Sequence, residues 1–298
     1  MEDHLIRATA LDGKVRAYAA YTTNIANELH SRHRTTPVAT AALGRLATAG
    51  VMMGAMLKGN ERLTLQIKGN GPLGQMVVDA NAAGEVRGYV DNPFVDLPPT
   101  AEGKLDVGGA VGKQGYLYVI KDLGLKEPYR GNVPLVSGEV AEDVTYYFAK
   151  SEQTPSAVAL SVLVNPDHTV KAAGGFILQL MPGLSEIEIS DMERRLGELP
   201  PLSAMLGDGM PLDRLLSQIV QPVRVLDRMN IRFRCQCSRE RVESTLISLG
   251  REEIETILNE DGKAEVVCHF CNETYVYDAE MLQSVLAKMS ESSNETSL

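Results

Sequence analysis

The sequence is short of positive charge, and it has no long apolar run. Lysine and arginine together number 29 of the 298 residues, against 39 aspartates and glutamates, so the formal net charge is −10. An acidic chain is repelled by phosphate backbones, which argues against nonspecific binding to nucleic acid. A membrane-spanning helix needs about 20 consecutive apolar residues, and no stretch of that kind is present. We therefore expect neither nucleic acid nor membrane among the partners.

The first residues also lack the pattern expected of a secretory signal. The chain is charged within its first three residues and lacks the apolar core of a signal peptide. The least polar stretch, 37–57, is rich in alanine and is interrupted by Arg45 and several glycines, which favours a buried helix. These features predict a cytoplasmic protein.

The remaining composition is that of a folded protein. Hydrophobic residues make up 44% of the chain and charged residues 23%, both ordinary for globular domains. The length suggests two domains and is sufficient to bury a sizeable core.

The hydrophobic pattern of the first 180 residues predicts an α+β domain built mostly on antiparallel sheet. The Asp12-Gly13 pair suits a hairpin turn within 4–21, and three short alternating runs separated by turns suggest a meander. Hairpins outnumber helices, which disfavours a doubly wound parallel sheet. The expected strands lie at 63–68, 75–80, 85–90, 116–121, 157–165 and 169–180, and the expected helices at 23–33, 36–58 and 140–150.

A different region follows at 181–230, which we expect to be an apolar helical linker. Ser185 and Glu188 have the spacing of a capping box, and a second short helix is expected from Pro211. The segment is too apolar to stay solvated and too small to form its own core, so it should pack on a neighbour. Its candidate interaction residues are Met181, Met192, Leu196, Met205, Leu212, Leu215, Leu216 and Ile219.

All four cysteines fall in the last segment, 231–298, as Cys235, Cys237, Cys268 and Cys271. This gives a C-x-C pair, thirty intervening residues and a C-x-x-C pair. Four thiolates converging from two short segments would fill the tetrahedral shell of one Zn²⁺ ion and leave no position for a reactive water. The pattern predicts a small zinc-binding module whose metal is structural or regulatory, and it argues against hydrolytic catalysis at this site.

Other interpretations of the cysteines are weaker. Ordinary buried thiols would not cluster in one corner of the chain, and a thioredoxin-like dithiol would need a helix beginning at its first cysteine. A nucleic-acid-binding zinc ribbon is disfavoured because 231–298 holds seven basic and thirteen acidic residues, a net charge of −6. His269 could replace one cysteine as a ligand, although a solvent-facing spacer is the simpler interpretation.

Two further patterns do not indicate function. Residues 69–74 satisfy G-x-G-x-x-G, but the strand-like residues that follow are not the helix that a dinucleotide site requires. The histidines His4, His30, His33 and His168 have no recognisable nucleophile motif nearby.

With these residues in view, the sequence resembles a known family, the redox-regulated cytosolic chaperones called heat shock protein 33 or 33 kDa chaperonin. The family's C-x-C and C-x-x-C pair matches with no cysteine missing. Further matching stretches are GNGPLG at 69–74, VSGEVAED at 136–143, SEQTPSAV at 151–158 and GGFILQLMPG at 174–183.

The resemblance implies an ATP-independent holdase that is inactive when reduced and loaded with one Zn²⁺ per chain. Oxidants such as peroxide or hypochlorous acid, together with unfolding conditions, would switch it on. The implied disulfides are Cys235–Cys237 and Cys268–Cys271, and the implied active form is a homodimer that captures unfolding client proteins. An alternative is a protein with a purely structural zinc module and an enzymatic or partner-binding first domain.

Overall fold

The computed structural model describes residues 2–295, with side chains up to residue 289. The chain divides into two compact units between Arg234 and Cys235. The predicted C-terminal segment began at 231, so the break falls four residues further on. Residues 181–230 belong to the first compact unit, although their predicted role as a separate linker stays a prediction about function.

Within the described residues, strands form two large sheets and one hairpin. The strands are β1 His4–Ala10, β2 Val15–Tyr21, β3 Arg62–Gly69, β4 Gln75–Asn81, β5 Glu85–Val90, β6 Gly115–Asp122, β7 Tyr129–Pro134, β8 Ser156–Val164, β9 Val170–Leu180, β10 Val223–Asn230, β11 Arg232–Phe233, β12 Ala264–Val267 and β13 Thr274–Tyr277. The helices are α1 Thr23–His33, α2 Pro37–Gly54, α3 Val107–Val111, α4 Ala141–Lys150, α5 Glu186–Glu198, α6 Leu202–Gly207, α7 Leu212–Ser217, α8 Arg239–Leu249, α9 Arg251–Glu260 and α10 Ala279–Glu295.

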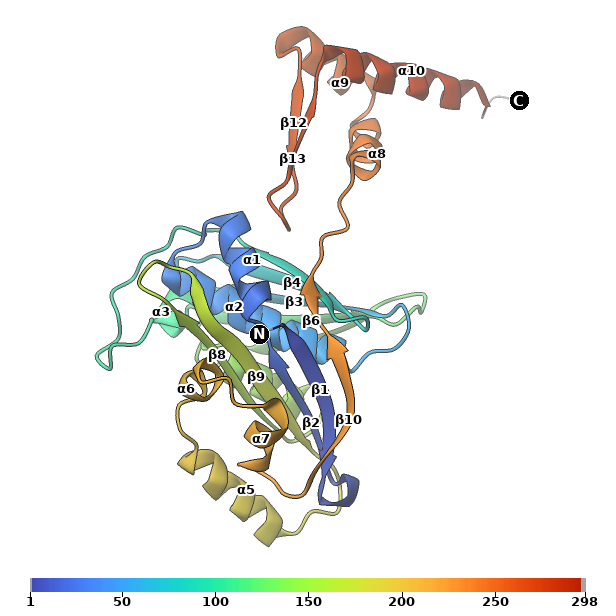
Figure 1. The fold of residues 1–298 in the computed structure, drawn as a ribbon. Helices are drawn as coiled ribbons and strands as arrows, with labels where there is room; N and C mark the ends of the chain where they lie inside the picture. The colour runs from blue at the N-terminus through green and yellow to red at the C-terminus, as the bar shows by residue number, and fades with distance from the viewer. Residues whose placement is uncertain (1, 296–298) are drawn as a thin grey trace. The chain divides into compact units, whose positions relative to one another are not determined.

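The two large sheets belong to the first unit (Figure 1). One has the strand order β10-β1-β2-β9-β8 and the other β11-β5-β4-β3-β6-β7. Their pairs are antiparallel except for β11 with β5, which is parallel. The predicted α+β class with a mostly antiparallel sheet is confirmed.

Helix α2 forms the centre of the first unit and contacts strands of both sheets. Almost all of its residues are buried, as expected for a helix that is apolar on every side. Its small side chains allow close packing: a Cβ atom added at Gly50 would lie 2.7 Å from a methyl group of Val78. The prediction of a buried helix in this stretch is confirmed, although the helix ends at Gly54, four residues before the expected boundary.

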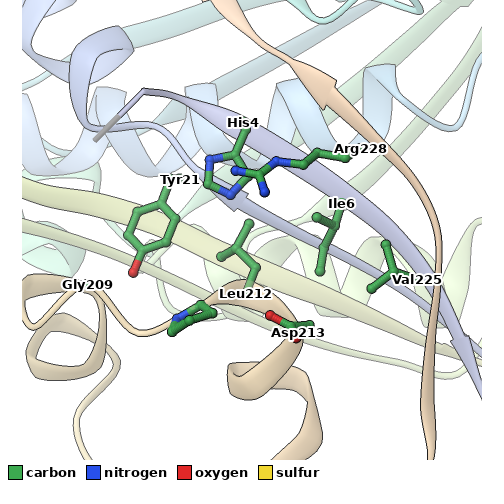
Figure 2. Close-up of a pocket in the computed structure, with 9 residues that line it drawn as sticks. His4, Ile6, Tyr21, Gly209, Leu212, Asp213, Val225 and Arg228 are labelled. Atoms are coloured by element: carbon green, nitrogen blue, oxygen red, sulfur yellow. The ribbon is translucent and has the colours of Figure 1, made fainter.

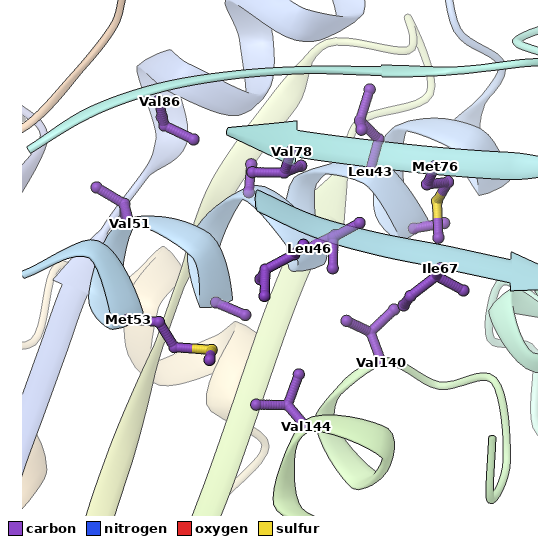
Figure 3. Packing of buried hydrophobic residues seen from close by; sticks show 14 of the residues in the cluster. Leu43, Leu46, Val51, Met53, Ile67, Met76, Val78, Val86, Val140 and Val144 are labelled. Carbon is purple, nitrogen blue, oxygen red and sulfur yellow. The ribbon is translucent and has the colours of Figure 1, made fainter. Parts of the chain in front are cut away.

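The main core surrounds α2 (Figure 3). Leu43 and Leu46 of α2 pack with strand residues such as Ile67 and Val78, and Val144 of α4 closes one side. The predicted meander of β3, β4 and β5 supplies much of this surface. Strand β7 was not predicted, because its sequence, YRGNVP, contains glycine and proline and shows no alternation.

Helices α5 to α7 pack on a second apolar cluster over β1, β2 and β9. The capping box predicted for α5 is present: the Glu188 amide donates to the Ser185 hydroxyl at 3.3 Å, and the Ser185 amide donates to the Glu188 carboxylate at 2.7 Å. The linker then ends in a strand, β10, which pairs with β1. This strand was not predicted, because most of its side chains are exposed and its sequence therefore carries no hydrophobic alternation.

Candidate metal centre

The four cysteines lie in two loops of the C-terminal unit. Cys235 and Cys237 precede α8, and Cys268 and Cys271 lie between β12 and β13. Their Sγ atoms are all within 4.8 Å of one another. The Sγ atoms of Cys235 and Cys268 are 3.7 Å apart, and those of Cys237 and Cys271 are 3.3 Å apart. The fold thus brings together the four residues that the sequence singled out.

Local structure fixes each loop. The C-x-x-C pair lies in the tight turn of the β12–β13 hairpin, where the Cys268 amide donates to the Glu273 carbonyl at 2.9 Å and the Asn272 amide to the Cys268 carbonyl at 2.7 Å. The C-x-C loop is held by Arg241, whose guanidinium donates to the Gln236 carbonyl at 2.8 Å. Ser238 caps α8 directly after this loop. Both cysteine pairs are therefore presented by main-chain turns that short-range contacts define.

These distances fit a four-sulfur metal site. Zinc bonds to thiolate at about 2.3 Å in a tetrahedron, which separates the sulfurs by about 3.8 Å. A disulfide would need about 2.05 Å, and all four residues are free cysteines. Soft sulfur ligands in this geometry are typical of Zn²⁺. The residues present therefore fit one zinc ion per chain.

Burial makes the sulfurs poor thiolates in the absence of a cation. Desolvation raises the pKa of the Cys268 thiol and, more strongly, that of Cys271. A coordinated divalent cation favours the deprotonated form, so metal binding and loss of the thiol protons are linked. The donor set is therefore suited to a metal whose release depends on the chemical state of the sulfurs.

Tyr275 contacts one of the four sulfurs, and the sequence did not reveal this contact. Its hydroxyl donates to the Sγ of Cys237 at 3.2 Å, and this hydrogen bond raises the pKa of the Tyr275 hydroxyl. Groups that hydrogen-bond to a metal ligand orient it and tune its affinity for the metal. The only sequence signal was the position of Tyr275 four residues after Cys271, in the returning strand of the hairpin.

His269 does not belong to the cluster of potential ligands. That cluster comprises the four cysteines, and the His269 side chain is exposed. The interpretation of His269 as a solvent-facing spacer agrees with this placement.

The predicted interaction residues of 181–230 are mostly buried in this structure. Leu215, Leu216 and Ile219 have 0% exposure, and Met192 has 5%. They pack against strand residues such as Ala17 and Phe176 in the second cluster. The other candidates are Met205 and Leu212, which are buried, and Met181 and Leu196, which are half-buried. The buried side chains among them can meet a partner only if the segment leaves the sheet.

A cleft of about 410 Å³ lies between this segment and the β1–β10 edge (Figure 2). One polar group of its wall holds the segment, because the Tyr21 hydroxyl donates to the Met210 carbonyl at 2.8 Å. On the same wall, a ring nitrogen of His4 lies 2.9 Å from the Glu2 carbonyl. The rings of His4 and Tyr21 pack at 5.6 Å. This cleft therefore lies at the contact between residues 209–213 and the sheet.

The G-x-G-x-x-G stretch forms the turn between β3 and β4, and it is followed by a strand, as the sequence indicated, and not by a helix. Among the described residues, none of the helices combines the length and the apolar character needed to cross a bilayer.

Comparison with known proteins agrees with these observations. The model of the Hsp33 protein family matches residues 3–278. The chain is 56% identical over 287 residues to a 33 kDa chaperonin of Geobacillus kaustophilus, with 96% of this chain and 98% of that relative covered. A 33 kDa chaperonin of Bacillus cytotoxicus is 53% identical over 288 residues, with 96% and 99% covered.

A solved structure is also similar. The crystal structure of a 33 kDa chaperonin from Thermotoga maritima, described as a heat shock protein 33 homolog, superposes with a TM-score of 0.91 at 38% identity. The likeness covers 98% of this chain and 100% of that one. From the family match, the level of identity and the shared fold, the chain belongs to the Hsp33 protein family.

Proposed function

We propose that this protein is a redox-regulated, ATP-independent holdase chaperone of the cytoplasm and not an enzyme. Family membership supports the chaperone role, since its relatives are named 33 kDa chaperonins. The proposed redox regulation rests on the cluster of four cysteine sulfurs, which lie within 4.8 Å of one another. In the reduced state Cys235, Cys237, Cys268 and Cys271 would hold one Zn²⁺, which keeps the sulfurs deprotonated and ties the two loops together.

Oxidation supplies the switch. A thiolate of Cys268 or Cys271 attacks a peroxide oxygen, giving a sulfenic acid and hydroxide. The neighbouring thiolate then displaces hydroxide from that sulfur, so one peroxide accepts two electrons and one disulfide forms. A second peroxide does the same for the other pair. The expected products are Cys235–Cys237 and Cys268–Cys271, with four metal ligands consumed and the zinc ion set free.

Loss of the ligands should unfold the C-terminal unit, because that unit has little core of its own. Its buried apolar cluster, within the described side chains, consists of Val242, Leu246, Ile254, Ala264, Tyr277, Leu282 and Val285. Structural zinc contributes on the order of 10 kcal/mol to the folding of small modules, and so small a core cannot replace it.

The segment 181–230 is the proposed source of the client-binding surface. Its candidate residues Met181, Met192, Leu196, Met205, Leu212, Leu215, Leu216 and Ile219 would become accessible when the segment loosens from β1, β2 and β9. Exposed, flexible apolar side chains bind non-native chains. The partners are unfolding proteins and, in the oxidised state, a second copy of this chain. The net charge of −10 disfavours nucleic acid and anionic membranes.

The test compares the reduced, zinc-loaded chain with a sample treated with peroxide at mildly elevated temperature. Released zinc, disulfide mapping by mass spectrometry and suppression of client aggregation are followed together. We expect release of one zinc per chain, disulfides between the neighbouring cysteines, and holdase activity that is reversed by a thiol reductant.

Two results would contradict the proposal. Disulfides that join Cys235 to Cys268, whose sulfurs are close in the reduced structure, would contradict the assigned pairing. Zinc release without any suppression of aggregation would favour the alternative, a purely structural zinc module attached to an enzymatic or partner-binding domain.

A further inference from the structure

The four residues before the first cysteine are bound to the edge of a sheet in the first unit. Strand β11 pairs in parallel with β5. The Arg232 amide donates to the Gly84 carbonyl at 3.0 Å, and the Arg234 amide donates to the Val86 carbonyl at 2.9 Å. The contact is short, and parallel pairing is slightly less stable per residue than antiparallel pairing. We call Ile231–Arg234 the resident segment.

One side of the resident segment is held by charge. The Glu85 carboxylate accepts hydrogen bonds from Arg232 at 2.8 Å and from Arg234 at 2.6 Å. The Glu85 side chain is only 11% exposed, whereas the two arginine side chains are 65% and 54% exposed. The hydrogen bond from Arg232, together with those from Arg234 and Asn81, lowers the pKa of Glu85 to about 2. The receiving strand therefore presents a fixed, largely buried negative charge.

The other side is held by apolar and aromatic contacts, as the alternation of a strand requires. Ile231 is 4% exposed and belongs to the main core. The Arg32 guanidinium lies 5.0 Å from the centre of the Phe233 ring. Gly84 makes room for Ile231, because a Cβ atom on Gly84, whose φ is +76°, would lie 2.9 Å from the Ile231 side chain.

We infer that the edge of β5 is a peptide-binding groove that takes up extended client segments in which apolar or aromatic residues alternate with lysine or arginine. The resident segment is its occupant in the resting protein. Strand addition to a sheet edge is a general mode of peptide recognition, in which the backbone supplies affinity and alternate side chains supply specificity. The timing of this exchange in the wild-type chain rests on the proposed redox function.

Physical chemistry favours replacement of the resident segment over an empty groove. If Ile231–Arg234 left, Gly84 and Val86 would lose their main-chain partners, and the carboxylate of Glu85 would lose two charged donors. Unpaired strand edges and unpaired buried charges are both costly. A basic, extended client segment restores each of these contacts, whereas an acidic segment would place like charges together.

The resident segment is also joined directly to the metal centre, because Cys235 follows Arg234. Unfolding of the C-terminal unit removes the fixed end of this short pairing. The groove would then become available in the same state in which clients are captured.

Two labelled peptides test the specificity by fluorescence anisotropy. One carries Ile-Arg-Phe-Arg and the other Ile-Glu-Phe-Glu in the same flanking sequence. The oxidised, zinc-free full-length chain should bind the basic peptide at least about tenfold more tightly than the acidic one, the factor expected for one charge-assisted hydrogen bond. The reduced, zinc-loaded chain should bind the basic peptide more weakly than the oxidised chain does, because the groove is occupied.

Variants locate the binding. Glu85→Gln should weaken binding of the basic peptide by about tenfold. Asp79→Asn is the matched control: Asp79 pairs with Arg87 at 2.8 Å in the same sheet but does not touch the resident segment, so its binding should match wild type. The proposed groove would be overturned if the oxidised chain bound both peptides equally, or if both variants lost the same affinity for the basic peptide.

A third arm does not depend on oxidation. The double variant Arg232→Glu/Arg234→Glu repels the resident segment from Glu85, so the reduced, zinc-loaded chain should bind the basic peptide more tightly than reduced wild type. Failure to do so would overturn the groove. If this variant binds the peptide but the oxidised wild type never suppresses aggregation, the groove stands and the holdase proposal fails. If the oxidised chain suppresses aggregation but binds the basic and acidic peptides equally, the holdase proposal stands and the groove fails.

Discussion

The two compact units of this chain are stabilised in different ways. The first is built around α2, which both large sheets cover, and its core holds dozens of buried apolar side chains. Among its described side chains, the second has a core of seven buried apolar residues and a cluster of four sulfurs. Burial grows with chain length faster than surface does, so a unit of about sixty residues is marginal without a staple. We therefore expect sensitivity to metal and oxidant to be confined to the C-terminal unit.

The largest expected effect comes from removing one sulfur. Cys271→Ser should abolish tight zinc binding and unfold the C-terminal unit, a loss on the order of several kcal/mol or more, while the first unit keeps its hydrogen-exchange protection. Metal analysis and exchange mass spectrometry measure both effects. The control is Ser238→Ala, which removes the α8 cap and should cost only about 1 kcal/mol. Zinc retained at full affinity by Cys271→Ser would refute the four-ligand assignment.

A second substitution asks whether the first unit can be opened without touching the metal. Leu215 is fully buried where α7 packs on the sheet, so Leu215→Ala should cost about 2–5 kcal/mol and loosen 181–230. We expect stronger binding of a hydrophobic dye by the reduced, zinc-loaded protein. Ile187→Ala, at a side chain that is 82% exposed, should leave the signal at the wild-type level. If both variants behave alike, docking of this segment does not control the apolar surface.

The pH dependence of stability tests a buried carboxyl group of the first unit. Asp3 accepts hydrogen bonds from the Asn24 and Ile25 amides at the start of α1, at 3.0 and 2.8 Å. Desolvation outweighs these bonds and raises its pKa from 3.8 to about 6. Because the folded state holds this proton more tightly, the group's contribution to stability decreases as the pH rises from about 4 to 6 and is constant above. The difference is about 3 kcal/mol.

The variant Asp3→Asn removes this titration. Urea midpoints measured between pH 4 and 6.5 should lose their Asp3-dependent slope in the variant, whereas Asp96→Asn, at an exposed position, should keep the wild-type slope. A slope that survives in Asp3→Asn would assign the titration to another group.

The smallest expected effect concerns the hydroxyl next to the metal centre. Tyr275→Phe removes the donor to the Cys237 sulfur at 3.2 Å and should weaken zinc binding by roughly 10–100-fold, the usual range for groups that support a ligand. Competition with a chromogenic chelator measures the affinity. The control is Tyr277→Phe in the same hairpin, which loses a hydrogen bond to the Arg239 carbonyl of α8. Equal affinities in the two variants would show that the hairpin, and not the contact with sulfur, matters.

Sequence reasoning succeeded where the signal was local. The capping box at Ser185 and the meander of β3 to β5 both follow from periodicity and turn residues within a few positions. The four cysteines were found by spacing alone. In each case neighbouring residues determine the structure, and tertiary contacts reinforce it.

It failed where the structure depends on distant partners. Strand β10 exposes Val225 and Leu226, so its sequence has no buried face to reveal, and it forms because β1 offers an edge. The pairing of β11 with β5 joins residues 147 positions apart, so no local pattern in the sequence indicates it. Neither the role of Glu85 nor the contact of Tyr275 with sulfur leaves a periodic mark in the sequence.

The abrupt change from Arg234 to Cys235 has a mechanical consequence. A single peptide bond joins Arg234, which is hydrogen-bonded to β5, to Cys235 of the sulfur cluster. No flexible residues separate the two sites. A few glycines inserted at this junction should uncouple the two sites. The sulfurs would still react with oxidant, but unfolding of the C-terminal unit would no longer loosen the pairing of β11 with β5.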